Sequence, residues 1–178
     1  MLQSIMARLL LVYLLSSVGV IEAREKSRLI TIGGGISELV CALDFCDEIV
    51  AVDATSTFPK SLQNLPNLGY YRQLNAEGIL QQKADLILLT DQAGPPPVMA
   101  HMQRLGLPLH VISSEKSVEG AKLRIQQIGK LLQAEEKAEK LLAKMEQDLA
   151  LAVEQSKASK QNGVSVVWLV LTGLLSPA

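Results

Sequence analysis

Short, mostly apolar runs alternate along the chain with stretches in which apolar residues recur every three or four positions. The short runs are bounded by glycine, proline or polar residues and predict strands at residues 29–32, 48–52, 84–90 and 109–112. The stretches between them predict helices at residues 36–43 and 75–82, and a third that starts in the proline run and ends near residue 105. This alternation predicts an α/β fold with a doubly wound parallel sheet.

Residues 117–159 show no strand pattern. Apolar residues at helical spacing continue through residues 117–159, with one interruption near Gln133. We therefore expect two helices, of which the second has about 24 residues and a length of ~36 Å. The predicted organisation is an N-terminal α/β ligand-binding lobe at residues 28–116, followed by a long helical segment between lobes at residues 117–159.

One further apolar run, at residues 164–171, has the pattern of a strand. The four earlier strands already form one sheet, and a lone strand would leave its backbone groups unpaired. We therefore expect residues 164–178 to be the start of a C-terminal lobe, and the second lobe to be missing from a truncated or frame-disrupted chain.

The N-terminal residues have the pattern of a secretory signal peptide at residues 1–23. Arg8 is their only charge before an apolar run that ends at Ile21, and this run is shorter than the ~20 residues of a spanning helix. Cleavage is expected after Ala23. Because Ile21 is larger than the usual residue three positions before a cleavage site, a retained N-terminal anchor is the alternative.

Charge and cysteine content narrow the possible classes of protein. The formal net charge is -1 and no basic cluster occurs, so no nucleic-acid partner is expected. The chain has two cysteines, Cys41 and Cys46, too few for a disulfide framework. Cys41 falls on an apolar helical face, and we expect both cysteines to be buried as small hydrophobic side chains.

The most distinctive chemistry lies between Gly69 and Gly78. Two of the three tyrosines of the chain, Tyr70 and Tyr71, are adjacent there and are followed by Arg72. A deprotonated phenol is a hard oxygen donor for ferric iron and is a known axial haem ligand, and a neighbouring guanidinium favours the phenolate. The alternative is structural: one tyrosine packs against the lobe while Arg72 is solvated.

No catalytic arrangement can be assigned a physical role. The sequence shows no Ser-His-Asp or Cys-His pattern and no motif of paired carboxylates with assignable roles. A binding module is therefore favoured over an enzyme.

The residues resemble a known family. The segments that carry the resemblance are residues 29–34, residues 48–53 with Thr55-Ser56, and above all residues 69–80. They are similar to the haem-binding periplasmic proteins of bacterial haem ABC importers, in the wider group that also carries cobalamin and iron siderophores. The resemblance covers about residues 28–168 and implies two α/β lobes joined by a long helix. It also implies that haem is held between the lobes and delivered from the periplasm to an inner-membrane permease with its ATPase.

The resemblance assigns roles to four residues. It makes Tyr70 the axial ligand of the haem iron and Arg72 the hydrogen-bond donor to its phenolate, with Tyr71 as a neighbour that packs on the haem. It makes Glu77 a docking contact for arginines of the permease. A carboxylate in a first helical turn also interacts favourably with the helix dipole, which is the alternative role of Glu77.

Other ligands and one other class of protein stay open. An iron-siderophore or cobalamin periplasmic binding protein would have the same fold and would not need Tyr70 on iron. An exported α/β enzyme whose catalytic half is missing is the alternative from a different class.

Overall fold

Residues 26–158 are described by the computed structural model of this chain. They form a four-stranded parallel sheet with helices between the strands. The elements follow one another as β1 (Leu29–Ile32), α2 (Gly34–Ala42), the 3-10 turn η1 (Cys46–Glu48), β2 (Ile49–Val52), the 3-10 turn η2 (Lys60–Asn64), α3 (Ala76–Gln81), β3 (Leu86–Thr90), α4 (Pro96–Arg104), β4 (Leu109–Ile112), α5 (Val118–Leu131) and α6 (Glu135–Ala158).

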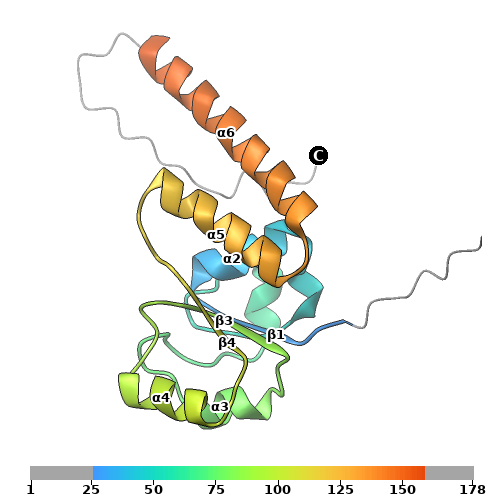
Figure 1. Cartoon of the computed structure of the whole chain (residues 1–178), viewed down its shortest axis with the longest axis vertical. Helices are drawn as coiled ribbons and strands as arrows, with labels where there is room; N and C mark the ends of the chain where they lie inside the picture. Colours follow the sequence, from blue (N-terminus) through green and yellow to red (C-terminus); the bar gives the residue numbers. More distant parts are fainter. Residues whose placement is uncertain (1–25, 159–178) are drawn as a thin grey trace, which may run out of the picture.

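The sheet has helices on both faces, which is the α/β architecture that the sequence predicts (Figure 1). The strand order is β2-β1-β3-β4, so β1 and β3 occupy the centre. On one face, α2, α5 and α6 bury an apolar cluster that includes Leu39, Ile125 and Leu141. On the other face, α3 and α4 bury a cluster that includes Ile79 and Met102. All four residues of β1 are buried because helices cover both of its faces.

Local residue chemistry explains where the helices begin. Asn75 caps α3, because its side-chain oxygen accepts a hydrogen bond from the Glu77 amide at 3.0 Å. Ser117 caps α5 in the same way, accepting from the Gly120 amide at 2.9 Å. At α4 the N-terminal position is taken by proline, whose missing N–H has no helical partner to lose there. The expected starts of all three helices are thus close to those observed.

Glycine is required where β1 turns into α2. Gly33 has φ +115°, a conformation that side chains rarely adopt. A Cβ on Gly34 would lie 2.6 Å from the Thr55 backbone oxygen, so this turn fits tightly against the loop after β2. The β1–α2 and β2–η2 loops are therefore held in contact at the carboxyl edge of the sheet.

The expectation for the cysteines was wrong in two respects. Cys41 is 7% exposed, as predicted, but Cys46 is only half-buried. The two cysteines also form a disulfide across the turn that follows α2. The chain reverses here through Asp44, which has φ 65°, and this reversal brings the two side chains together. A helical residue and a residue five positions later are far apart in a continuous helix, which is why the spacing did not indicate a bond.

Helices α5 and α6 are separated at the interruption that the sequence indicates. Gln133 has φ 54°, which ends helical geometry, and α6 then runs for 24 residues. At the crossing, a Cβ added to Gly129 would lie only 2.5 Å from the Ala138 Cβ, so the two helices pack almost backbone to backbone. None of residues 146–157 of α6 is buried, and this end of the helix extends away from the sheet (Figure 1).

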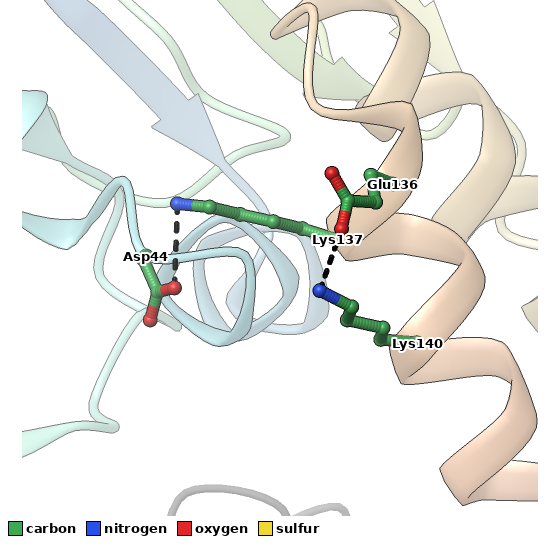
Figure 2. A network of polar contacts seen from close by, with 4 residues as sticks. All are labelled: Asp44, Glu136, Lys137 and Lys140. Atoms are coloured by element: carbon green, nitrogen blue, oxygen red, sulfur yellow. Dashed lines mark hydrogen bonds and ion pairs between the residues drawn. The ribbon is translucent and has the colours of Figure 1, made fainter.

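An ion pair fixes the start of α6 to the lobe. Lys137 Nζ lies 3.3 Å from Asp44 Oδ2, while Lys140 pairs with Glu136 within the helix itself (Figure 2). None of the helices within residues 26–158 is long and apolar enough to cross a membrane. The signal peptide expected at residues 1–23 and the second lobe expected to start at residues 164–178 lie outside the described residues.

Candidate functional site

The strand order defines where a ligand would bind. After β1 the chain places β2 on one side of it and β3 on the other, which makes the gap between β1 and β3 the switch point of the sheet. In open α/β sheets, ligands bind outside the carboxyl ends of the strands at such a point. The candidate site is therefore expected beside Gly33, which follows β1, and Thr90, which ends β3.

A pocket of ≈ 510 Å³ is present at this place. Its lining comes from the segments that follow all four strands and from one residue of α5. The lining residues are Gly33, Gly34, Gly35, Ile36, Thr55, Tyr71, Arg72, Thr90, Gln92, Ile112, Ser113, Ser114, Glu115, Lys116 and Arg124.

The loop with the two tyrosines is held against the end of β2. Leu68 donates its amide to the Val52 carbonyl at 2.8 Å, and the Ala54 amide donates to the Gly69 carbonyl at 2.8 Å. Gly69 has φ +86°, so the chain turns sharply immediately before Tyr70. The loop thus reaches the pocket from a defined anchor.

The two tyrosines lie in different environments. Their ring centroids are 4.5 Å apart at an interplanar angle of 55°. Tyr71 packs on the apolar cluster beneath α3 and α4, lines the pocket, and its carbonyl accepts from the Gly94 amide at 2.9 Å. Tyr70 is 42% exposed and is not among the pocket-lining residues. One phenol is therefore packed and the other projects into solvent beside the pocket.

The hydrogen bond between the two phenols shifts their pKa values in opposite directions. It raises the pKa of Tyr70, which is held in its protonated form, and lowers the pKa of Tyr71. The charge of Arg72 acts to lower both pKa values, whereas the charge of Asp53 acts to raise both. Of the two phenols, Tyr71 is therefore the one whose ionisation is favoured.

Arg72 is oriented by neutral partners. Its Nη2 donates to Gln92 Oε1 at 2.8 Å, and its guanidinium carbon lies 5.4 Å from the centre of the Tyr71 ring. Gln92 Nε2 in turn donates to Ser114 Oγ at 2.7 Å. This chain of contacts joins the tyrosine loop to the loops that follow β3 and β4.

A buried carboxylate connects two of the loops that line the pocket. Asp53, which is 1% exposed, accepts hydrogen bonds from the Gly33 amide at 2.9 Å and from Ser56 Oγ at 2.8 Å. It also accepts from the amide and the hydroxyl of Thr55, at 3.1 Å and 2.7 Å. The loops after β1 and β2 are therefore tied to one side chain.

Glu77 lies apart from the pocket. It is exposed in the first turn of α3, and its side chain is not part of the pocket lining. The structure thus brings Tyr70, Tyr71 and Arg72 together and leaves Glu77 on the outside of the lobe. Both expected roles of Glu77 are compatible with an exposed carboxylate in this position.

Sequence reasoning missed several residues of the pocket. Gln92 and Ser114 connect its loops, and Arg124 reaches it from α5. Gln92 and Ser114 each follow the end of a predicted strand by two residues, and this position was the available signal. Arg124 gave no signal, because an arginine on an amphipathic helix is usually a solvated residue.

Comparison with known proteins shows the family. The family model described as "Periplasmic binding protein" matches residues 29–173. The chain therefore belongs to the periplasmic binding protein family.

Solved structures similar to this chain include two haem-binding proteins. A periplasmic heme binding protein from Pseudomonas aeruginosa is 32% identical, with a TM-score of 0.72 over 74% of this chain and 47% of that protein. The periplasmic heme-binding protein RhuT from Roseiflexus sp. RS-1 is 30% identical, with a TM-score of 0.73 over 77% of this chain and 52% of that protein. These likenesses confirm the fold class predicted from the sequence.

One curated protein similar to this chain is named for a different ligand, vitamin B12. The vitamin B12-binding protein of Yersinia pseudotuberculosis serotype O:1b (strain IP 31758) is 33% identical over 98 residues, which is 55% of this chain and 35% of that protein. The chain therefore spans about a third of the curated relative and about half of the solved structures. All three are named for binding, which agrees with the expectation of a binding protein rather than an enzyme.

Proposed function

We propose that this chain is the periplasmic substrate-binding component of an ABC haem importer. It binds ferric haem through the Tyr70 phenolate and delivers the haem to an inner-membrane permease with its ATPase. The observation that carries this proposal is the placement of two adjacent phenols and a guanidinium beside the pocket at the switch point of the sheet.

The geometry supports Tyr70 as the iron ligand by its accessibility. An axial ligand must approach iron at the centre of a large flat porphyrin, and Tyr70 projects from a glycine turn with 42% of its surface exposed. Tyr71 is fixed by packing and lines the pocket, where its ring can lie against the porphyrin. Tyr70 loses its phenolic proton when it binds iron, and Arg72 lies close enough to favour the resulting charge.

Tyr71 is the alternative ligand within the same proposal. It contacts Arg72 and has the lowered pKa, so its phenolate costs less to form. The two assignments differ in one measurable respect, which is the substitution that removes the phenolate-to-iron charge-transfer band.

The test is a titration of the purified chain with haemin, followed by absorption spectroscopy. Tyr70→Phe is expected to abolish the charge-transfer band and to weaken binding, while Tyr71→Phe keeps the band. The reverse pattern would move the ligand to Tyr71. Equal loss from both substitutions, or no loss from either, would refute ligation by one tyrosine of this pair.

Cobalamin is the second candidate ligand, because a curated relative is named as a vitamin B12-binding protein. A cobalamin site does not need a phenolate on iron. The same protein titrated with cyanocobalamin is therefore the direct comparison: tighter binding of cyanocobalamin than of haemin, unaffected by Tyr70→Phe, would replace haem with cobalamin. A ferric siderophore is tested in the same way.

Location and docking follow from the same proposal. A signal peptide at residues 1–23 would carry the chain to the periplasm, where Glu77 would contact the permease. The position of Glu77 on the outside of the lobe, away from the pocket, supports a role toward a partner rather than toward the ligand.

A further inference from the structure

The pocket has an excess of positive charge that the tyrosine loop does not explain. Four charged residues line it, and three of them are cationic: Arg72, Lys116 and Arg124, against Glu115. The Glu115 carboxylate accepts a hydrogen bond from Ser117 Oγ at 2.8 Å, and no ion pair joins it to these cations. A pocket with this charge favours an anionic ligand group.

Arg124 is held at the pocket by backbone carbonyls. Its Nη1 donates to the Glu115 carbonyl at 2.7 Å and to the Ser113 carbonyl at 3.3 Å. Among residues 26–158, no carboxylate lies within ion-pair distance of its guanidinium. Neutral acceptors therefore orient the side chain and leave its charge uncompensated.

Arg72 is held in the same manner and at the same loop. Its partner Gln92 is bonded to Ser114, the neighbour of Ser113, to which Arg124 donates. Each guanidinium has five N–H donors, of which these contacts use only part. Two arginines are thus connected to one loop, each with free donors and without an ion pair in the described part of the chain.

We propose that Arg72 and Arg124 form a subsite for a pair of carboxylates on the ligand. The planar guanidinium matches a carboxylate in geometry and binds it with charge-assisted hydrogen bonds. Haem carries two propionate carboxylates on one edge, whereas the side chains of cobalamin end mainly in amides. The inference rests on the proposed function, because haem is the ligand that brings two carboxylates to this pocket, and it assigns Arg124 a binding role.

The test compares porphyrins that differ only in their carboxylates. Binding of haemin and of haemin dimethyl ester is measured for the unchanged protein, for Arg124→Gln and for Arg104→Gln. Arg104 is an exposed arginine at the end of α4 outside the pocket and serves as the control. We expect Arg124→Gln to weaken haemin binding by roughly tenfold or more, to leave ester binding unchanged, and Arg104→Gln to change neither.

Two other outcomes would contradict a binding role for Arg124. Equal loss for haemin and its ester would show that Arg124 only supports the loop between Ser113 and Glu115. No loss for haemin would remove Arg124 from the site.

Metal-free protoporphyrin IX and its dimethyl ester separate the subsite from the proposed function. Their binding, followed by fluorescence, does not depend on iron ligation by Tyr70. If protoporphyrin binds with the Arg124 dependence and haemin shows no phenolate band, the subsite stands and tyrosine ligation fails. If neither porphyrin acid binds, both are overturned.

Discussion

Lys137 Nζ lies 3.3 Å from Asp44 Oδ2 (Figure 2) and 5.0 Å from the centre of the Phe45 ring. One ammonium group of α6 thus contacts two residues of the turn that the Cys41–Cys46 disulfide closes. Lys140, one turn further along, has its one ion pair within residues 26–158 with Glu136 of its own helix. The neighbouring lysines therefore provide a matched pair for measuring how α6 is attached to the lobe.

Lys137→Ala is expected to lower the free energy of unfolding by about 1 kcal/mol, because it removes a partly exposed ion pair and a cation–π contact. Lys140→Ala should cost less, since it removes only a pair within the helix. Both changes alter helix propensity equally. Urea unfolding measures the difference, and equal losses from the two variants would show that the contacts to Asp44 and Phe45 contribute nothing.

Reduction of the disulfide is expected to destabilise the lobe by about 2 kcal/mol, the loop-closure entropy of so short a loop. The measurement compares urea unfolding with and without dithiothreitol. A thiol titration of the unfolded, unreduced protein is the control and should detect no free thiol. Two free thiols in that control would show that the bond does not form, and Cys41 would then only be a buried side chain.

Asp53→Ala is expected to cost roughly 2 to 4 kcal/mol, because four hydrogen bonds to a buried carboxylate lose their acceptor. Asp53→Asn, which keeps one oxygen acceptor, should cost less. Asp47, whose side chain is 90% exposed, provides the control, and Asp47→Ala should be nearly neutral. A neutral Asp53→Ala variant would mean that the two loops hold each other without this side chain.

The two tyrosines should respond to substitution in opposite directions. Tyr71→Phe removes the hydrogen bond that raises the pKa of Tyr70, so that pKa should fall. Tyr70→Phe removes the hydrogen bond that lowers the pKa of Tyr71, so that pKa should rise. Ultraviolet absorption during alkaline titration reports both changes. Shifts of the same sign would contradict a hydrogen bond with Tyr70 as donor.

This pairing also sets the sign of the pH dependence of haem binding. Ligation through Tyr70 releases its proton, and the raised pKa keeps that proton bound at neutral pH. Haemin affinity should therefore increase as the pH rises toward the pKa of Tyr70. In Tyr71→Phe, where the pKa of Tyr70 is expected to be lower, this increase should level off at a lower pH.

Glu77→Lys is expected to leave haemin affinity unchanged and to reduce haem uptake into vesicles that contain the permease and its ATPase. Glu139→Lys, which reverses an exposed carboxylate on α6, is the control for net charge. A loss of stability alone, with normal uptake, would assign Glu77 to the helix dipole of α3. A loss of haemin affinity would instead place Glu77 at the ligand.

The fold was predictable where local pattern and tertiary packing agree. The first and the fourth predicted strands, at residues 29–32 and 109–112, have the same bounds as β1 and β4 in the structure. The predicted second strand began one residue early, because Glu48 ends a 3-10 turn before β2. That turn directly follows the disulfide loop, a non-helical reversal through Asp44 for which residue spacing carries no signal.

The candidate site was predictable only in part. Tyr70, Tyr71 and Arg72 are rare residue types in one short segment, so their chemistry is visible in the sequence. Arg124 is held at the same pocket by hydrogen bonds to backbone carbonyls of the loop after β4. Because every residue has a backbone carbonyl, the sequence does not indicate which ones will bind an arginine. Its role therefore depends on the folded path of the chain rather than on residue type.

The close approach of Gly129 to Ala138 makes the crossing of α5 and α6 a pivot. From Ala138 to Ala158 the helix extends for ~30 Å, so a tilt of roughly 5° at the pivot moves its far end by about 3 Å. A side chain at position 129 would push α5 and α6 apart at their crossing and change the direction of α6. The absence of a side chain at Gly129 therefore helps to set where the far end of α6 lies.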